Sequence, residues 1–508
     1  MSTASRVIKN TGFLYIRMAV SIVFSFFTTR ILLQTLGASD YGLYNVVGGA
    51  LAMLGFLSAS LSSTTQRFIS YAEGEGNNER ILCVVNTAVR LHNLLAMAVC
   101  TFFVIMGYFI FSFVLNIPDG RTTVAVAVYG CMIVSTVFSI TIVPYDGVLN
   151  AHENMKFYSL LGIVDVIAKF VIALMVMFAG SLDKLLFYGV LMAAEAWAFR
   201  MVTKWYSVRH YDEVRNIDVK RYASKEVMRE MTSFAGWNLL NIASAMILLY
   251  GNNMIVNHFC GTIVNAAMGV ASQLSGVLMG VSLNMTKALT PILVKSEGSH
   301  NREQVIKYSL IGCKFSYLLF SFFAVPVIFC LNPLLHLWLT EVPEWTEIFC
   351  LLMLVSVLIE QLFLFLFSSI NAQGNIKWYN IVIALLNLFA IILGYVELYH
   401  GLPPYFATLN YIIFKVVLGG IVNVYYSQRN FGLRYTDYIS KVILPCFVTT
   451  ATIGLACYAL YPYDSNSSGL MLLRFVLMLI VSIPIYYIFA FSKEERNNLL
   501  RLIQKRFK

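Results

Sequence analysis

The stretch NAHENMKFY (residues 150–158) recurs 221 residues later as NAQGNIKWY (residues 371–379). Asn, Ala, Asn, Lys and Tyr are identical in the two copies. A second pair of related segments, EGEGNNE (residues 73–79) and EGSHNRE (residues 297–303), has a similar offset of 224. Two matches at nearly one offset predict that the chain contains two homologous halves.

The composition identifies an integral membrane protein. Of the 508 residues, 59% are hydrophobic, and the mean hydropathy is +0.73, whereas soluble domains are about 45–50% apolar. Apolar runs of the roughly 20 residues needed to cross a bilayer recur along the chain. We therefore predict an all-α protein with about 14 transmembrane helices. The expected spans are residues 8–33, 42–71, 80–115, 122–144, 154–180, 183–207, 232–257, 262–294, 304–331, 345–370, 376–398, 402–428, 437–461 and 467–491.

The spacing of the copies predicts the architecture. Six predicted spans separate them, and because six is even, the two halves enter the membrane from the same side as parallel repeats. We expect two six-helix lobes in the arrangement of many transporters, followed by two further helices. The predicted parts are an N-lobe (1–208), an amphipathic cytoplasmic connector (209–231), a C-lobe (232–428), and a final helix pair with a basic tail (429–508). The connector is either a passive solvated linker or part of a gate.

The distribution of basic residues predicts the orientation. The breaks on the side of both termini are rich in Lys and Arg, whereas only Arg121 and Lys184 lie in the opposite breaks. By the positive-inside rule, both termini are cytoplasmic. This asymmetry explains the net charge of +10 without a nucleic-acid partner. The basic C-terminal tail is expected to contact anionic membrane lipids.

Ionisable residues inside predicted spans are functional candidates, because they are costly in lipid and usually face a cavity or a partner. In the first span, a helical projection places Arg17 in a polar stripe. Arg30 projects almost opposite and is better explained by snorkelling or packing. The stripe consists of Asn10, Arg17, Ser21, Ser25 and Thr28.

Comparable stripes occur later in the chain. Asn284 and Lys287 share a face of the eighth span with a Gly-x-x-x-Gly motif, which could instead pack helices. Tyr411 and Lys415 share a face of the twelfth span.

Acidic residues are fewer than basic residues in the spans. Asp165 and Lys169 lie four residues apart in the fifth span and can neutralise one another, so a structural and a functional role are equally open. Asp165 and Glu360 are candidates for ion coupling or for charge pairs. A cavity lined by Arg, Lys and hydroxyl groups suits a phosphorylated sugar rather than an organic cation.

The residues that look most like an active site are His152 and Glu153. A zinc protease motif would need a second His at position 156, which is Lys156. The second copy replaces His152 and Glu153 with Gln373 and Gly374, and the nine cysteines lack metal-binding spacing. We therefore predict no catalytic residue, no metal and no cofactor.

Five segments have a recognisable pattern: TTRILLQTLGASDYGLYNVVGG (28–49), SSTTQRF (62–68), PYDGVLNAHENMKF (144–157), FAGWN (234–238) and FCGTIVNAAMGVASQL (259–274). Together they resemble the Wzx-like polysaccharide flippases of bacteria, in the superfamily that also contains MATE drug exporters and the lipid II flippase. The resemblance implies that Arg30 is a site residue after all, and it adds Arg67 as a further candidate site residue. One departure is Met268, where the family often has a basic residue after Asn-Ala-Ala.

The resemblance implies a V-shaped pair of six-helix lobes in the bacterial cytoplasmic membrane. Alternating access would move an undecaprenyl-diphosphate-linked oligosaccharide from the inner to the outer leaflet, for O-antigen or capsule synthesis. An ion gradient or the membrane potential would drive the movement. A polysaccharide polymerase and glycosyltransferases would be partners.

Three alternatives remain. A MATE-like antiporter of cationic drugs would favour more carboxylates in the spans than this chain has. A membrane polymerase or glycosyltransferase would need a sizeable outer loop, and the longest outer break, near residues 331–345, is short. A scaffold without transport activity would not explain charges kept at depth in the membrane.

Overall fold

The computed structural model describes residues 3–52, 55–109, 111, 120–180, 182–339, 341–460, 468–492 and 495–496. Helices dominate these residues, which contain no β-strand. Among them, twelve helices are long and apolar enough to cross a membrane. The predicted class, an all-α membrane protein, is confirmed.

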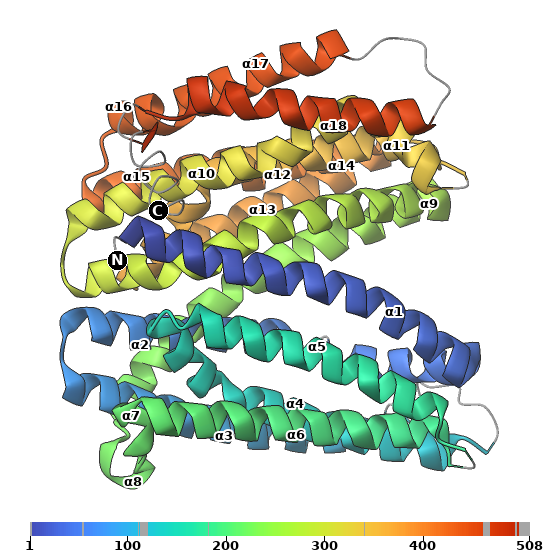
Figure 1. The fold of residues 1–508 in the computed structure, drawn as a ribbon, viewed down its shortest axis with the longest axis vertical. Coiled ribbons are helices and arrows are strands. Elements are labelled where there is room, and N and C mark those ends of the chain that lie inside the picture. The colour runs from blue at the N-terminus through green and yellow to red at the C-terminus, as the bar shows by residue number, and fades with distance from the viewer. Residues whose placement is uncertain are drawn as a thin grey trace, which may run out of the picture. The chain divides into compact units, whose positions relative to one another are not determined.

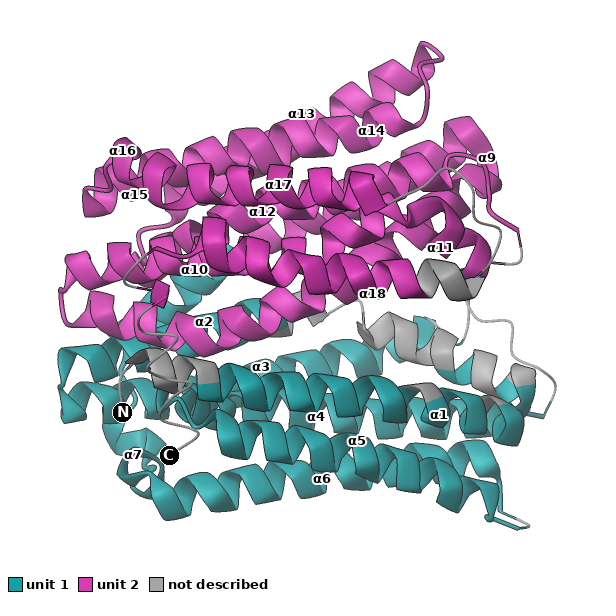
Figure 2. Cartoon of the chain, turned by 45° about the horizontal axis from the view of Figure 1, so that its top comes forward, with its two compact units in different colours: residues 1–239 teal, residues 240–508 magenta. Residues whose placement is uncertain are grey.

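The chain forms two compact units, residues 1–239 and 240–508 (Figure 2). Unit 1 contains the first eight helices and the start of the ninth. Within it, α1 packs on α5, and α4 packs on α2, α3 and α6 (Figure 1). These helices are α1 (Thr3–Ala52), α2 (Gly55–Glu75), α3 (Asn78–Phe109), α4 (Thr122–Ala151), α5 (Met155–Met177), α6 (Lys184–His210), α7 (Asp212–Arg215) and α8 (Val219–Tyr222).

Unit 2 contains most of α9 (Lys225–Gly298) and the elements after it. Within it, α10 packs on α12, and the late helices α17 and α18 pack on each other and on α10. The elements are α10 (Arg302–Phe329), α11 (Leu331–Trp338), α12 (Thr346–Gln373), α13 (Lys377–Tyr399), α14 (Tyr405–Asn410), η2 (Tyr411–Leu418), α15 (Gly419–Phe431), α16 (Tyr435–Tyr438), η3 (Ile439–Ile443), α17 (Leu444–Leu460), α18 (Ser468–Ile485) and η4 (Tyr486–Ala490).

The difference between twelve helices and about 14 predicted spans has two sources. The 74-residue helix α9 counts once, although it covers the predicted spans 232–257 and 262–294 and breaks at Gly261. The predicted span 42–71 falls across the end of α1 and most of α2. Residues 53 and 54, between those helices, lie outside the described part of the chain.

The backbone repeats the duplication seen in the sequence. Gly37 (φ 76°, ψ 167°) breaks α1, and Gly261 (φ 82°, ψ −179°), 224 residues later, breaks α9 in the same conformation. A positive φ favours glycine, because other residues meet steric strain there. Four further pairs of residues, separated by 221 to 225 positions, have positive φ in both halves. The pairs are Gly76 with His300, Gly120 with Trp345, Glu153 with Gly374, and Gly180 with Gly401.

The pair formed by Glu153 and Gly374 explains the opening motif. Both residues adopt positive φ, 55° and 92°, at the end of a helix. The second copy uses glycine, the residue that tolerates this conformation best. The repeated stretch is therefore a tight turn that joins consecutive helices, α4 to α5 in unit 1 and α12 to α13 in unit 2.

Candidate functional site

Unit 1 encloses a charged cavity of about 240 Å³ among α1, α4, α5 and α6. Three of the predicted site residues, Arg17, Asp165 and Lys169, line it. Because these helices pack on one another, residues far apart in sequence meet at one place. The lining residues are Arg17, Phe138, Ser139, Ile142, Asp146, Tyr158, Leu161, Gly162, Asp165, Lys169, Glu195, Ala196 and Phe199.

Arg17 lies against the backbone of α5. Its guanidinium carbon is 4.8 Å from the centroid of the Tyr158 ring, a cation–π contact. A Cβ atom added at Gly162 would lie 2.1 Å from Arg17 Nε and 2.5 Å from its Cζ, so only glycine leaves room for this side chain. Among the described residues, no carboxylate forms an ion pair with Arg17. The guanidinium can therefore bind an anion from the cavity.

Asp165, Lys169 and Glu195 form a second polar group in this cavity. Lys169 Nζ lies 2.8 Å from Asp165 Oδ1, so the predicted i, i+4 pair is present. Glu195 on α6 lines the same cavity, and its Oε1 is buried without a hydrogen-bond partner. A carboxyl group can hold or release a proton, so Glu195 is the candidate proton-binding group of this cavity.

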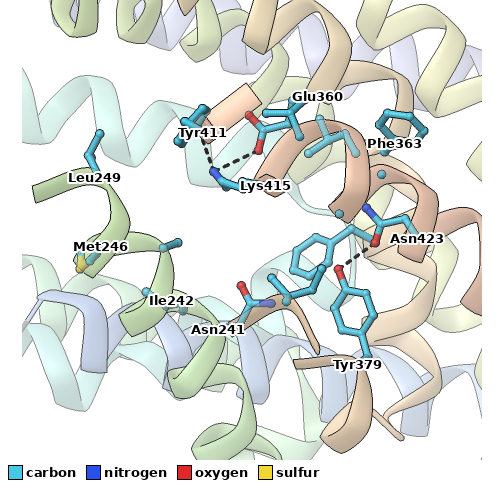
Figure 3. Close-up of a pocket in the computed structure, with 17 residues that line it drawn as sticks. Asn241, Ile242, Met246, Leu249, Glu360, Phe363, Tyr379, Tyr411, Lys415 and Asn423 are labelled. Carbon is cyan, nitrogen blue, oxygen red and sulfur yellow. Dashed lines mark hydrogen bonds and ion pairs between the residues drawn. The ribbon is translucent and has the colours of Figure 1, made fainter. Parts of the chain in front are cut away.

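Unit 2 encloses a cavity of about 390 Å³ among α9, α12, α13, η2 and α15 (Figure 3). Its walls are mainly aromatic and aliphatic, with a few amides and one ion pair. The predicted site residues Tyr411, Lys415 and Glu360 line it. The lining residues are Asn241, Ile242, Ala245, Met246, Leu249, Glu360, Phe363, Leu364, Phe367, Tyr379, Ile383, Tyr411, Lys415, Val416, Gly419, Gly420 and Asn423.

The charges of this cavity balance each other. Lys415 Nζ lies 3.5 Å from Glu360 Oε1 and donates a hydrogen bond of 2.8 Å to the Tyr411 hydroxyl. Both Tyr411 and Lys415 belong to η2, a π-helical stretch, and such stretches often occur at functional sites. The sequence predicted Lys415 as a cavity cation and Glu360 as a residue for ion coupling or a charge pair, and the structure places the two in one ion pair.

The remaining polar groups of the cavity are amides. The Tyr379 hydroxyl donates to Asn423 Oδ1 at 2.7 Å, which leaves the Asn423 amide nitrogen as a donor. Asn241 donates to Asn380 at 2.9 Å, which leaves Asn241 Oδ1 as an acceptor facing the cavity (Figure 3). Phe363 also lines this cavity. A Cβ atom at Gly420 would lie 2.4 Å from its ring.

The two cavities occupy equivalent positions in the two halves. Tyr158 and Tyr379, the last residues of the repeated stretch, line one cavity each. At the offsets of 221 and 224, further lining residues correspond across the chain. They are Arg17 with Asn241, Ser139 with Glu360, Ile142 with Phe363, Asp146 with Phe367, Gly162 with Ile383, Glu195 with Val416, and Phe199 with Gly420.

Other predicted site residues lie elsewhere. Arg30 on α1 is exposed, Lys287 on α9 is exposed, and Asn284 is half-buried. None of the three lines either cavity. Arg67 stacks its guanidinium on aromatic rings, including that of Phe68 at 4.7 Å.

His152 joins three segments of unit 1. Its ring nitrogens lie 2.8 Å from Glu73 Oε1 and 2.5 Å from Glu213 Oε1, and its ring stacks on Tyr211. Burial disfavours the charged ring, but the hydrogen bonds and charges of Glu213 and Glu73 outweigh burial and raise the pKa of His152 to about 9. Glu213 lies in α7, within the predicted connector, so His152 fastens that segment to the turn.

Several site residues were not predicted. Tyr158 and Tyr379 were signalled by their identity in the two copies. Gly162, Asn241 and Asn423 had no signal of their own, because an apolar helix shows many equivalent glycines and amides. Their roles depend on which helix packs against them.

Comparisons with known proteins identify the fold. Residues 239–396 match the MatE family model, and no curated protein sequence matches the chain. A crystal structure of MATE in the straight conformation superposes with a TM-score of 0.73 at 14% identity, covering 85% of this chain and 97% of that one. The chain has the fold of MATE transporters.

Two further structures agree. One is an outward-facing multidrug resistance MATE family transporter of the MOP superfamily, with a TM-score of 0.71, 13% identity, and coverage of 85% of this chain and 96% of that one. The other is a MOP superfamily transporter from Pyrococcus furiosus, with a TM-score of 0.70 at 13% identity and the same coverage. The binding pocket of that transporter has reverse polarity, which suggests a different function for it. At these identities the likeness establishes the fold.

Proposed function

We propose that the chain is a flippase that moves an undecaprenyl-diphosphate-linked oligosaccharide from the inner to the outer leaflet of the bacterial cytoplasmic membrane. The observation that carries the proposal is Arg17. It lies in a transmembrane helix, lines a cavity, and has no ion pair among the described residues. A guanidinium inside the membrane costs free energy unless it binds an anion. The paired N–H donors of Arg match the oxygens of a diphosphate.

The fold supports movement by alternating access, in which two repeats bind a substrate near the middle of the membrane. Both termini would lie in the cytoplasm. A polysaccharide polymerase and glycosyltransferases would act on the product and supply the substrate. The reverse polarity described for the Pyrococcus furiosus relative is a precedent within this fold for a pocket of altered charge.

The test is Arg17→Ala in the source cells, with the protein level checked by immunoblotting. Loss of surface polysaccharide together with accumulation of its lipid-linked precursor supports the proposal. Tyr250→Phe is the matched control, because Tyr250 is 60% exposed on α9 and lines neither cavity. Unchanged export by the Arg17 variant at normal protein level would remove Arg17 from the site.

The coupling ion that we propose is a proton held by Glu195. Its Oε1 is buried without a hydrogen-bond partner, whereas Asp165 in the same cavity is already paired with Lys169. Glu195→Gln keeps a hydrogen-bond donor but cannot exchange a proton. In proteoliposomes it should retain substrate binding and lose acceleration of transport by a pH gradient. Acceleration equal to that of the wild type would exclude Glu195.

A MATE-like antiporter of organic cations is the second candidate, favoured by the match of residues 239–396 to the MatE model. Two of the lining carboxylates argue against it, because a cation would have to displace Lys415 from Glu360 or Lys169 from Asp165. Efflux of ethidium from cells that express the chain distinguishes the two. Efflux that Arg17→Ala leaves intact would favour the antiporter.

A further inference from the structure

We propose that the cavity of unit 2 is a saccharide subsite, which recognises the glycan of the lipid-linked substrate. This inference rests on the proposed function and concerns the cavity of unit 2 alone.

The first argument is the change of chemistry between equivalent positions. Arg17 in unit 1 corresponds to Asn241 in unit 2, and Asp146 corresponds to Phe367. One formal cation and one formal anion are thus replaced by an amide and an aromatic ring. Tyr158 and Tyr379 are the same in both copies. At the two charged positions the copy in unit 2 has an amide and an aromatic ring in place of charges, and the charge gained at Glu360, where unit 1 has Ser139, is paired with Lys415.

The second argument is the polar groups that remain available. Asn423 offers an amide donor, since its oxygen accepts from Tyr379. Asn241 offers an acceptor, since its nitrogen donates to Asn380. A sugar hydroxyl is both donor and acceptor and can use either group. An organic cation would gain nothing from the Asn423 amide donor. The carboxylate of Glu360, which could attract a cation, is already paired with Lys415.

The third argument is the aromatic wall. The Phe363 ring lies against α15, where Gly420 leaves space for it. The Tyr379 ring lies 6.0 Å from that of Phe367, and both line the cavity. The C–H faces of a pyranose ring pack on such flat surfaces, while its hydroxyls reach the amides at the edge. The volume of about 390 Å³ lies in the range of about 300–1,000 Å³ typical of ligand pockets.

The experiment compares two ligands. One is the lipid-linked glycan that accumulates in source cells lacking this gene, and the other is undecaprenyl diphosphate, which has no sugar. Native mass spectrometry of the purified full-length chain gives a dissociation constant for each. The quantity that matters is the ratio of the two constants, because it isolates the contribution of the glycan.

The test variant is the double substitution Tyr379→Phe/Asn423→Leu. It removes both partners of one hydrogen bond, so neither is left unpaired, which keeps the cost to folding small. Phe363→Leu is the second variant, and Phe389→Ala is the control, because Phe389 is 57% exposed on α13 and lines neither cavity.

The wild type should bind the glycan-bearing ligand more tightly, and the double variant should lower that preference about tenfold. Phe363→Leu should lower it several-fold, and Phe389→Ala should preserve it. Arg17→Ala should weaken both ligands equally and keep the ratio.

Two results would overturn the inference while leaving the proposed function intact. One is a wild type that binds both ligands equally. The other is a double variant that keeps the ratio or weakens both ligands by one factor, as expected if the cavity holds the lipid chain. If no glycan accumulates in the deletion cells, or if the wild type binds neither ligand, the proposed function itself fails.

Discussion

The cavities of units 1 and 2 line equivalent positions of a duplicated sequence, yet they differ in charge. In unit 1, Arg17 reaches the cavity without a carboxylate partner among the described residues, and the Asp165–Lys169 ion pair lies in the same cavity as Glu195. In unit 2, Lys415 and Glu360 neutralise each other among aromatic rings. Duplication therefore preserved the backbone and the position of the cavity, while substitution of a few lining residues changed its chemistry.

The ion pair of unit 2 gives the largest expected effect. Lys415→Met leaves Glu360 without its ammonium partner and should lower the stability of the purified chain by about 1–3 kcal/mol. This is less than the roughly 3–5 kcal/mol for a fully buried pair, because about a quarter of each side chain, 24% and 26%, is exposed. Thermal unfolding in detergent, followed by fluorescence, measures the change.

The double substitution Lys415→Met/Glu360→Gln is the matched control. It removes both charges and should restore most of the lost stability. A double variant that is less stable than Lys415→Met alone would show that the charges act separately, and the proposed neutrality of this cavity would then fail.

Gly162→Ala tests whether the position of the Arg17 side chain in unit 1 matters for binding. The new methyl group would overlap Arg17, whose flexible side chain would move away from Tyr158 while the fold remains. We expect about a tenfold loss of binding to undecaprenyl diphosphate, the equivalent of about 1.4 kcal/mol. Gly130→Ala is the control, since a Cβ there meets no atom within 4 Å. Equal binding by both variants would contradict the importance of Arg17 geometry.

Gly420→Ala is the counterpart in unit 2. Its methyl group would overlap the Phe363 ring and tilt the aromatic wall. The preference for the glycan-bearing ligand should fall about fivefold, with little change in binding of undecaprenyl diphosphate. Gly269→Ala, which meets no atom within 4 Å, should behave like the wild type. A fall in affinity for both ligands would remove the distinction between the cavities.

The smallest effect concerns the turn of unit 1, which has no counterpart in unit 2 because Gln373 replaces His152. The raised pKa of His152, about 9 against an ordinary 6.5, means that its stabilisation is complete below about pH 6.5. It is lost as the pH rises through about 9. After correction for the intrinsic pH dependence of amide exchange, hydrogen exchange in α7 should therefore increase a few-fold between pH 7 and 10.

His152→Gln should show faster exchange in α7 at pH 7 and a smaller change between pH 7 and 10, after correction for intrinsic exchange. If the wild type and the variant respond equally to pH, the contacts of His152 with Glu73 and Glu213 do not fasten the connector. The same comparison at α13, in the other half, serves as an internal reference.

Much of the fold was accessible from the sequence. Hydropathy gave the membrane class, and the repeated stretch revealed the duplication that the backbone repeats at Gly37 and Gly261. The span at residues 42–71 was harder to place, because α1 ends and α2 begins within it. The site was only partly accessible. Helical projection identified Arg17, but Arg30 had entered only through resemblance and does not line either cavity.

The positions of the apolar helices, their breaks and their repetition are local consequences of hydropathy and backbone sterics, so they could be predicted from the residues. Which charges are available depends on how the helices pack. Glu360 and Lys415 lie 55 residues apart and form an ion pair, while Arg17 meets Gly162 and Tyr158 across two helices. A charge's role depends on the partners within a few ångströms, and those are fixed by helix packing.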